Sequence, residues 1–285
     1  MARPVPSAHP LDTLRDITTS LEASILLCLA KPRKIAVHRL RTAIRRVEAQ
    51  LQLLAILPGL PPHQRQAGKA LRLLKKLRRA AGKVRDIDVQ RDLLRTDAGS
   101  QKSPRRLDPE LRKQSRQLRR DLKLKREKQA EQLLELLTRH QSDLPLRFEK
   151  LLDALAPAQA LTLSEAELTS LTRTWFEDHA HRGADSPATP QTTQQLHEVR
   201  KRAKTARYFA ESAPESAKAA HRLAARFEKL QQTGGDWHDS YLLAEIAGHK
   251  LGTSAKLPQS LDRKTDRALR TFQRQLRNFP PDLAR

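Results

Sequence analysis

Two short segments of this chain carry a histidine followed by basic residues at helical spacing. VHRLRTAIR at 37–45 recurs as LHEVRKRAK at 196–204, with the histidine, an apolar residue, an arginine and a final basic residue in matching places. In an α-helix, His38, Arg41 and Arg45 lie within about 60° of one another, beside an apolar face. Cations grouped in this way bind anions, phosphate among them, through charge-assisted hydrogen bonds.

A second pair of similar segments follows the first pair in the same order. LRRAAGKVRD at 77–86 matches LQQTGGDWHD at 230–239, with Gly82 aligned to Gly235. Because both pairs are separated by nearly the same length of chain, the sequence predicts two homologous halves.

Further helices are predicted to carry one-sided basic stripes. Lys or Arg recurs in them every three or four residues, a spacing at which like charges destabilise a helix. Solvated helix faces usually mix charges, so repeated stripes of one sign favour anion binding, although any single stripe also fits a solvated face. The stripes are Lys69, Arg72, Lys76, Arg79 and Lys83; Arg112, Arg116, Arg119, Lys123 and Arg126; His197, Arg200, Lys204 and Arg207, with Lys201 beside them; and Arg263, Arg267, Arg270, Arg274 and Arg277.

The chain as a whole is strongly basic. Its 285 residues include 55 Lys and Arg against 32 Asp and Glu, a formal net charge of +23. An anionic partner is therefore expected. Charge alone does not separate nucleic acid, phosphate polymers and acidic membrane surfaces. Aromatic residues make up only 4% of the chain, which argues against a platform that stacks unpaired bases.

The single cysteine, Cys28, lies in the apolar run 23–30, where a buried thiol is expected, and it excludes a disulfide framework within the chain. That apolar run is far shorter than the roughly 20 residues of a membrane span. The N-terminal segment MARPVPSAHPLDTLRD lacks the uninterrupted apolar stretch of a signal peptide. We therefore expect a cytoplasmic protein with no membrane partner.

The spacing of apolar residues predicts an all-α fold, because they recur every three or four residues and no convincing alternating strand occurs. Segments rich in Pro and Gly divide the chain. A single domain at 9–280 is predicted, with a four-helix half at 9–142, a connecting segment at 143–163 and a second four-helix half at 164–280. The predicted helices span 11–30, 34–56, 63–94, 108–140, 164–181, 192–212, 215–250 and 260–278.

Four aspartates lie among the cations: Asp86, Asp88, Asp236 and Asp239. A carboxylate facing an anionic ligand would repel it, so we expect these groups to pair with arginines or histidines and to hold the helices in register. His238 and Asp239 leave a metal site open, but their spacing is not diagnostic. No cofactor, metal site or catalytic residue is predicted.

The segments VHRLRTAIRR and GKVRDIDV, followed by LHEVRKRAKTARYF and LQQTGGDWHDSYLL, resemble the CHAD family, the conserved histidine α-helical domain. The resemblance extends over nearly the whole chain. It implies two pseudo-symmetric four-helix bundles, which bind inorganic polyphosphate through a basic surface formed by both halves. By motif match, that role falls on His38, Arg41, Arg45, Arg46, His197, Arg200, Lys201, Lys204 and Arg207.

The chain departs from the family pattern in two places. Ala81 and Gly234 stand where the family usually has leucine, and His238 stands where asparagine is common. Some family members are fused to a CYTH-type triphosphate hydrolase with an ExExK strand signature. Here SEAELT at 164–169 has both glutamates but Thr169 in place of the lysine, and it is predicted to start a helix. Hydrolysis therefore has no support.

We expect the stripes of the two halves to line a shared groove or channel that binds inorganic polyphosphate without catalysis, with association to polyphosphate granules as a further expectation. Two alternatives stay open. One is a sequence-independent nucleic-acid-binding protein that uses the same charge. The other is a polyphosphate-processing enzyme, although the clustered carboxylates of such chemistry are lacking. If the histidines contact phosphate, binding should strengthen as the pH falls through their titration range. The sequence does not determine the oligomeric state.

Overall fold

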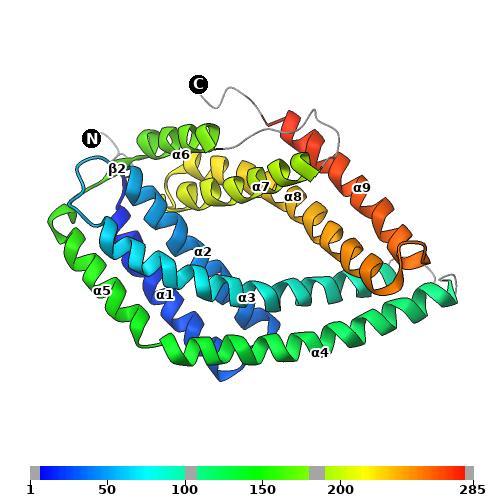
Figure 1. Ribbon diagram of the computed structural model, residues 1–285. Helices are drawn as coiled ribbons and strands as arrows, with labels where there is room; N and C mark the ends of the chain where they lie inside the picture. Colours follow the sequence, from blue (N-terminus) through cyan, green and yellow to red (C-terminus); the bar gives the residue numbers. More distant parts are fainter. Residues whose placement is uncertain (1–6, 100–107, 180–189, 280–285) are drawn as a thin grey trace.

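The computed structural model describes residues 7–99, 108–179 and 190–279. Within these ranges the chain forms nine α-helices and two very short strands, which confirms the all-α prediction. In chain order the elements are β1 (Ser7–Ala8), α1 (Pro10–Ala30), α2 (Lys34–Ile56), α3 (Gln64–Gly99), α4 (Pro109–His140), α5 (Asp143–Leu155), β2 (Leu163–Ser164), α6 (Glu165–His179), α7 (Pro190–Glu211), α8 (Lys218–Leu251) and α9 (Lys256–Arg277) (Figure 1).

Helix α5 lies in the connecting segment 143–163, where the sequence pattern predicts no helix. Asp143 is its first residue and Pro145 lies in its first turn, where a proline forfeits no helical hydrogen bond. The sequence DLP therefore starts a helix instead of ending one. Helix α5 buries Phe148 and Leu151 and packs against α1 and α3.

The two strands are also absent from the sequence prediction. Strand β1 pairs antiparallel with β2, and Ala8 lies opposite Leu163. Two residues are too few to show the alternation by which a strand is recognised. The pairing ties the start of the described chain to the segment between α5 and α6.

The start of α6 confirms the helix predicted for SEAELT. The Ser164 hydroxyl accepts a hydrogen bond from the backbone N–H of Glu167, whose carboxylate accepts one from the backbone N–H of Ser164 at 2.8 Å. This reciprocal pair is a capping box. Glu165 accepts hydrogen bonds from the backbone N–H groups of Ala219 and Ala220 at the start of α8. Both glutamates of the segment therefore cap helices.

One apolar core runs through both predicted halves. It includes Cys28 of α1, Leu40 of α2, Phe148 of α5, Phe227 of α8 and Phe272 of α9. Cys28 is fully buried, as predicted, and burial raises the pKa of its thiol to about 11. A smaller core joins the ends of α3 and α4 to α8 and α9.

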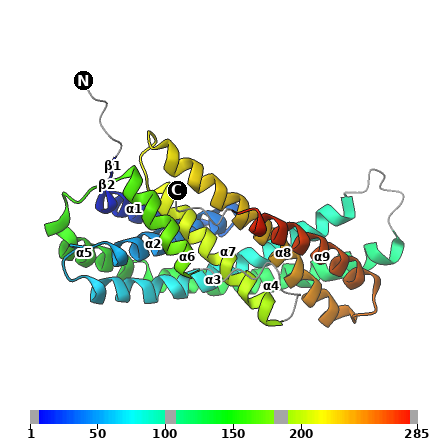
Figure 2. The same ribbon diagram turned by 90° about the horizontal axis from the view of Figure 1, so that it is seen from above.

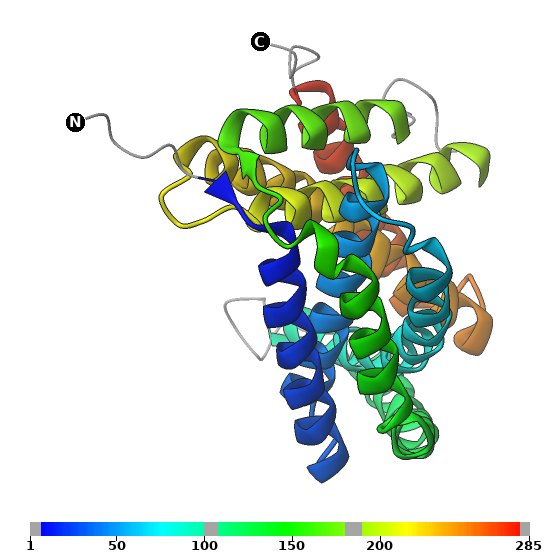
Figure 3. The same cartoon turned by 90° about the vertical axis from the view of Figure 1, so that its left-hand side faces the viewer.

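Three corresponding helix pairs, and a smaller contact between α4 and α8, connect the two predicted halves. Helix α2 packs against α7, α3 against α8, and α4 against α9. Each pair joins the second, third or fourth long helix of one half to its counterpart in the other, while the pseudo-twofold relation itself stays a prediction. Figure 2 shows an elongated molecule with α1, α2 and α5 gathered at one end, and Figure 3 shows α6 and α7 lying across α1 and α5. None of the helices in the described ranges is both long and apolar enough to cross a membrane.

Candidate functional site

Basic side chains from both predicted halves meet where α2, α3 and α7 come together. The apolar residues of α2 and α7, such as Val37 and Leu196, are fully buried, so the adjoining basic flanks of the two helices face each other and α3. Their side chains are close enough to shift one another's pKa values. We call this group the interhelical basic cluster; it consists of His38, Arg41 and Arg45 of α2, Arg78 and Arg85 of α3, and Arg200 and Lys204 of α7.

Burial and like charges depress the pKa values of Lys204, Arg45 and Arg200 in the cluster. Burial, followed by the neighbouring arginines with Arg41 first among them, lowers the pKa of Lys204 to about 7. Burial also lowers the pKa of Arg45 to about 10 and that of Arg200 to about 10. An anion placed among these groups would favour their charged forms. The cluster therefore carries more positive charge than the acidic side chains near it can balance.

Two guanidinium groups of the cluster also have unused hydrogen-bond donors. The Nε atoms of Arg45 and Arg200 are buried and have no hydrogen-bond partner among the described residues. Buried donors are normally satisfied, because leaving one unpaired costs about 1–3 kcal/mol. Glu48 accepts a hydrogen bond from Arg78 Nε at 2.8 Å and lies 3.8 Å from Arg45 Nη1. An anionic oxygen is one kind of acceptor that would satisfy the remaining donors.

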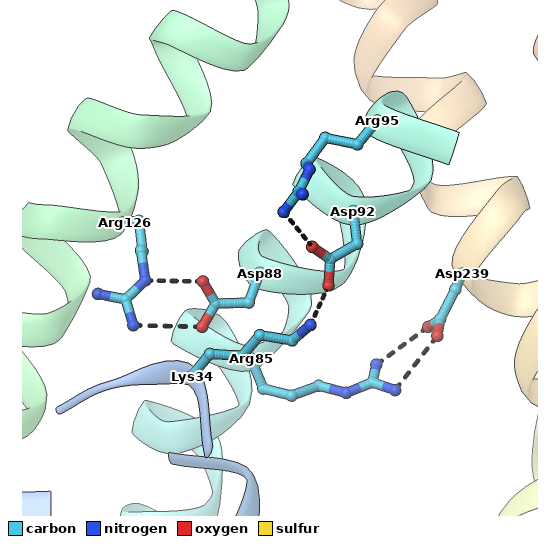
Figure 4. A network of polar contacts seen from close by, with 7 residues as sticks. All are labelled: Lys34, Arg85, Asp88, Asp92, Arg95, Arg126 and Asp239. Atoms are coloured by element: carbon cyan, nitrogen blue, oxygen red, sulfur yellow. Dashed lines mark hydrogen bonds and ion pairs between the residues drawn. The ribbon is translucent and has the colours of Figure 1, made fainter. Parts of the chain in front are cut away.

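The aspartates near the cluster pair with arginines, as predicted. Arg85 donates to both carboxylate oxygens of Asp239 at 3.1 and 3.2 Å, and to Asp86 at 3.3 Å. Burial alone would lower the pKa of Arg85, but Asp239 and Asp86 raise it overall. Asp88 accepts two hydrogen bonds from Arg126 of α4. Figure 4 shows Arg85 reaching α8 and Asp88 facing α4, so these pairs hold α3 in register with both neighbours.

Asp236 is the fourth aspartate of the predicted set. Burial and then Asp239 raise its pKa, and Lys264 of α9 opposes them. Within the described ranges, no group of three or more His, Cys, Asp or Glu side chains is placed to hold a metal ion. The carboxylate of Asp239, which the sequence left as a possible metal ligand beside His238, is bound by Arg85.

The two histidines of the matching segments lie in different surroundings. His38 is exposed, whereas His197 is half-buried with its Nδ1 atom 3.3 Å from that of His238. Burial and then Arg200 lower the pKa of His197 to about 4 and that of His238 to about 3. Partial desolvation of its ring and then Arg85 also lower the pKa of His38, although the residue as a whole is exposed. In the free protein, burial and neighbouring cations therefore favour the neutral imidazole, and the dependence of binding on these histidines stays a prediction.

Two glycines allow the arginines of the matching segments to lie close to the next helix. A Cβ atom on Gly82 would stand 3.4 Å from Arg41 Nη1. A Cβ atom on Gly234 would stand 2.9 Å from the Phe272 ring and 3.0 Å from Arg200 Cγ. Gly235, which the alignment matches to Gly82, has nothing within 4 Å of such an atom. Gly234 is thus required by close packing, and a leucine would not fit there.

Three cationic side chains lie near the aromatic ring of Tyr208 at the edge of the cluster. The charged groups of Arg46, Lys204 and Arg207 lie 5.8, 6.0 and 5.9 Å from the centre of the Tyr208 ring, within the range of cation–π attraction. Glu211 accepts hydrogen bonds from Arg46 at 3.3 Å and from Arg207 at 2.6 Å. Arg46 and Arg207 therefore connect α2 to α7 beside the cluster.

The other residues predicted from the stripes are not members of the cluster. Lys201 is half-buried and bonded to Glu198 within α7. The side chains on other helices are Lys76, Arg79 and Lys83 on α3, all exposed; Arg116 and Lys123, exposed, and Arg119, half-buried, on α4; and Arg267, Arg270 and Arg274, exposed, on α9.

Sequence reasoning did not select Arg78 and Arg85, which the structure brings into the cluster. The sequence did contain an indication for Arg85, because Arg85 follows Gly82 at the same spacing at which His238 follows Gly235. The contact between Arg78 and Glu48 joins residues 30 apart on different helices, and no spacing within one helix indicates it.

Comparisons with known proteins agree with this architecture. No curated protein matches the sequence. Among solved structures, PptA from Streptomyces chartreusis is similar, with 17% identity and a TM-score of 0.65 over 95% of this chain and 99% of that one. A CHAD domain from the plant Ricinus communis is also similar, with 18% identity and a TM-score of 0.59 over 100% of this chain and 92% of that one. The CHAD domain model matches residues 20–248, well over half of the chain, and the protein therefore belongs to the CHAD domain family.

Proposed function

We propose that this protein binds inorganic polyphosphate in the interhelical basic cluster and catalyses no reaction there. The observation that carries the proposal is the uncompensated charge of the cluster. Within the described part of the chain, Arg45 and Arg200 keep buried Nε donors without partners, and Lys204 lies among arginines that lower its pKa. A fold that holds such cations together is stabilised when a polyanion neutralises them.

The arrangement of the donors suits a linear chain of phosphates. Arg41 and Arg45 are one helical turn apart on α2, and Arg200 and Lys204 are one turn apart on α7, which packs against α2. Two facing rows of cations match a ligand that carries charge on every unit. The family resemblance implies the same ligand.

The acids near the cluster support binding without catalysis. Phosphoryl transfer generally uses carboxylates that hold metal ions. Asp239 and Asp86 are instead engaged by Arg85. The cytoplasmic location and the association with polyphosphate granules stay predictions.

A competition experiment tests the proposal. The protein is titrated with long-chain polyphosphate and with duplex DNA at equal phosphate concentration and near-physiological salt, and we expect tighter binding of polyphosphate. The double variant Arg41→Gln/Arg200→Gln should lose at least tenfold in affinity. The matched control is Lys150→Gln/Arg222→Gln, which removes two exposed charges from α5 and α8.

Three results would contradict the proposal. Tighter binding of duplex DNA than of polyphosphate would indicate that the basic cluster binds nucleic acid. Equal affinity of the cluster variant and the control would remove the cluster from binding. Release of phosphate in the presence of magnesium or manganese would show catalysis.

A further inference from the structure

A basic depression lies between α3 and α4, apart from the interhelical basic cluster. It has a volume of about 410 Å³ and is lined by seven basic and three acidic side chains from α3, α4 and the start of α2. None of these residues belongs to the interhelical basic cluster. Its basic side chains include Arg33, Lys34, Arg91, Arg95, Arg119 and Lys123.

The acids of this α3–α4 pocket leave much of its charge unbalanced. Asp88 is used by Arg126, which also donates to the backbone oxygen of Pro32 at 2.8 Å and so ties α4 to the loop before α2. Asp92 forms ion pairs with Lys34 and, at 3.9 Å, with Arg95 (Figure 4). One carboxylate is thus shared between two cations of the pocket. The third acid, Glu127, lies 3.9 Å from Lys123, so three carboxylates face seven cations.

Two arginines of the pocket have unused donors. The Nε atoms of Arg91 and Arg119 are buried and have no hydrogen-bond partner among the described residues. The same two side chains line an adjoining depression of about 260 Å³ together with Arg116, Arg120 and Lys123. The pocket therefore continues along α4 as a basic path.

We propose that the α3–α4 pocket is a second phosphate site, which binds a short run of condensed phosphate, and that Asp92 serves as its internal counter-ion until the ligand displaces it. The proposal rests on the proposed function, since polyphosphate supplies the ligand. Lys34 connects the two places: it pairs with Asp92 in the pocket and acts electrostatically on His38 of the cluster. A chain that leaves the cluster therefore meets cations along the way to the pocket.

Calorimetric titration with sodium triphosphate tests the second site, because this ligand is too short to bridge distant cations. We expect two binding events in the unmodified protein. Arg91→Gln/Arg119→Gln should remove one event, and Arg41→Gln/Arg200→Gln should remove the other. Thermal unfolding followed by circular dichroism checks that each variant is folded.

The variant Asp92→Asn provides a test in the opposite direction. It removes a negative charge from the pocket and releases Lys34 and Arg95, so the affinity of one event should rise by roughly fivefold, the effect of a unit charge a few ångströms away in water. The matched control is Glu131→Gln, an equal charge change at an exposed position of α4 outside the pocket. A gain equal in both variants would contradict the role of Asp92.

The outcomes separate this inference from the proposed function. A single event that only Arg41→Gln/Arg200→Gln removes would overturn the second site and leave the cluster in place. A single event that only Arg91→Gln/Arg119→Gln removes would uphold the pocket and overturn the cluster as the site. With long-chain polyphosphate, weaker binding by Arg91→Gln/Arg119→Gln assigns the pocket to a segment of the polymer, and unchanged binding assigns it to free short phosphates.

Discussion

Lys204 is expected to make the proposed binding of a polyanion depend on pH. Burial lowers the pKa of Lys204 to about 7 in the free protein, and Arg41, Arg45 and Arg200 act in the same direction. A bound polyphosphate would surround the ammonium group with negative charge and raise its pKa toward the ordinary value. The protein therefore takes up a proton on binding, so the affinity is highest below pH 7 and falls as the pH rises above it.

The size of this effect follows from the titration of one group. With a pKa of about 7, the protonated fraction of Lys204 falls from about nine-tenths at pH 6 to about one-tenth at pH 8. If the ligand binds the protonated form alone, the affinity falls about tenfold over this range, or about 1.4 kcal/mol. His197 and His238 do not titrate in this range in the free protein, because their pKa values of about 4 and about 3 lie below it.

The assay is a binding titration with long-chain polyphosphate at pH 6, 7 and 8 and constant ionic strength. A long chain keeps the contribution of its titrating end groups small. Lys204→Met should bind more weakly at pH 6 and should show little change in affinity up to pH 8. Lys229→Met, an exposed position on α8, should keep the slope of the unmodified protein.

The stability of the free protein should change in the opposite sense. The pKa of Lys204 is lower in the folded chain than in the unfolded one, so unfolding takes up a proton between about pH 7 and 10 and stability rises with pH in that window. Lys204→Met should remove this dependence and raise the midpoint of thermal unfolding. Affinity that is flat from pH 6 to 8 in the unmodified protein, or a slope that survives in Lys204→Met, would refute the reasoning.

Three further results are expected. Gly234→Ala should lower the free energy of unfolding by about 1–3 kcal/mol in denaturant titrations, because its Cβ meets Phe272 at 2.9 Å. The control Gly235→Ala, which has open space around the new Cβ, should be neutral or stabilising. Equal losses of stability in the two variants would contradict the packing argument. Asp239→Asn should cost about 1–3 kcal/mol by weakening the half-buried pair with Arg85, and an unchanged unfolding midpoint would show that the pair contributes nothing. Polyphosphate affinity should fall by about 10³–10⁵ between 50 and 200 mM salt if six to ten phosphates are contacted, as on duplex DNA; a shallow slope would count against the basic cluster.

Local patterns were enough to predict most helices. Helix α2 spans Lys34–Ile56, as predicted, because Val37, Leu40 and Ile44 repeat at helical spacing and are fully buried. Boundaries that depend on tertiary contacts were predicted less well. Helix α9 begins at Lys256 instead of residue 260, and Leu257 in its first turn is buried in the smaller core.

The residues of the candidate site, like the helices, were predicted only in part from the sequence. The repeated segments predicted that Arg41, Arg45, Arg200 and Lys204 lie on the basic flanks of two helices. They also predicted that an aspartate such as Asp239 pairs with a cation. Both inferences need only helical geometry and the unfavourable placement of a carboxylate beside an anion.

Sequence by itself determined the all-α class, the two basic helices and their membership of a repeated pattern, because each is a property of neighbours along the chain. Only the tertiary structure decided which stripes meet, that Arg78 and Arg85 join them, and that burial lowers the pKa values of His197, His238 and Lys204. These properties depend on burial and on distances between helices. Spacing within one helix specifies neither of them.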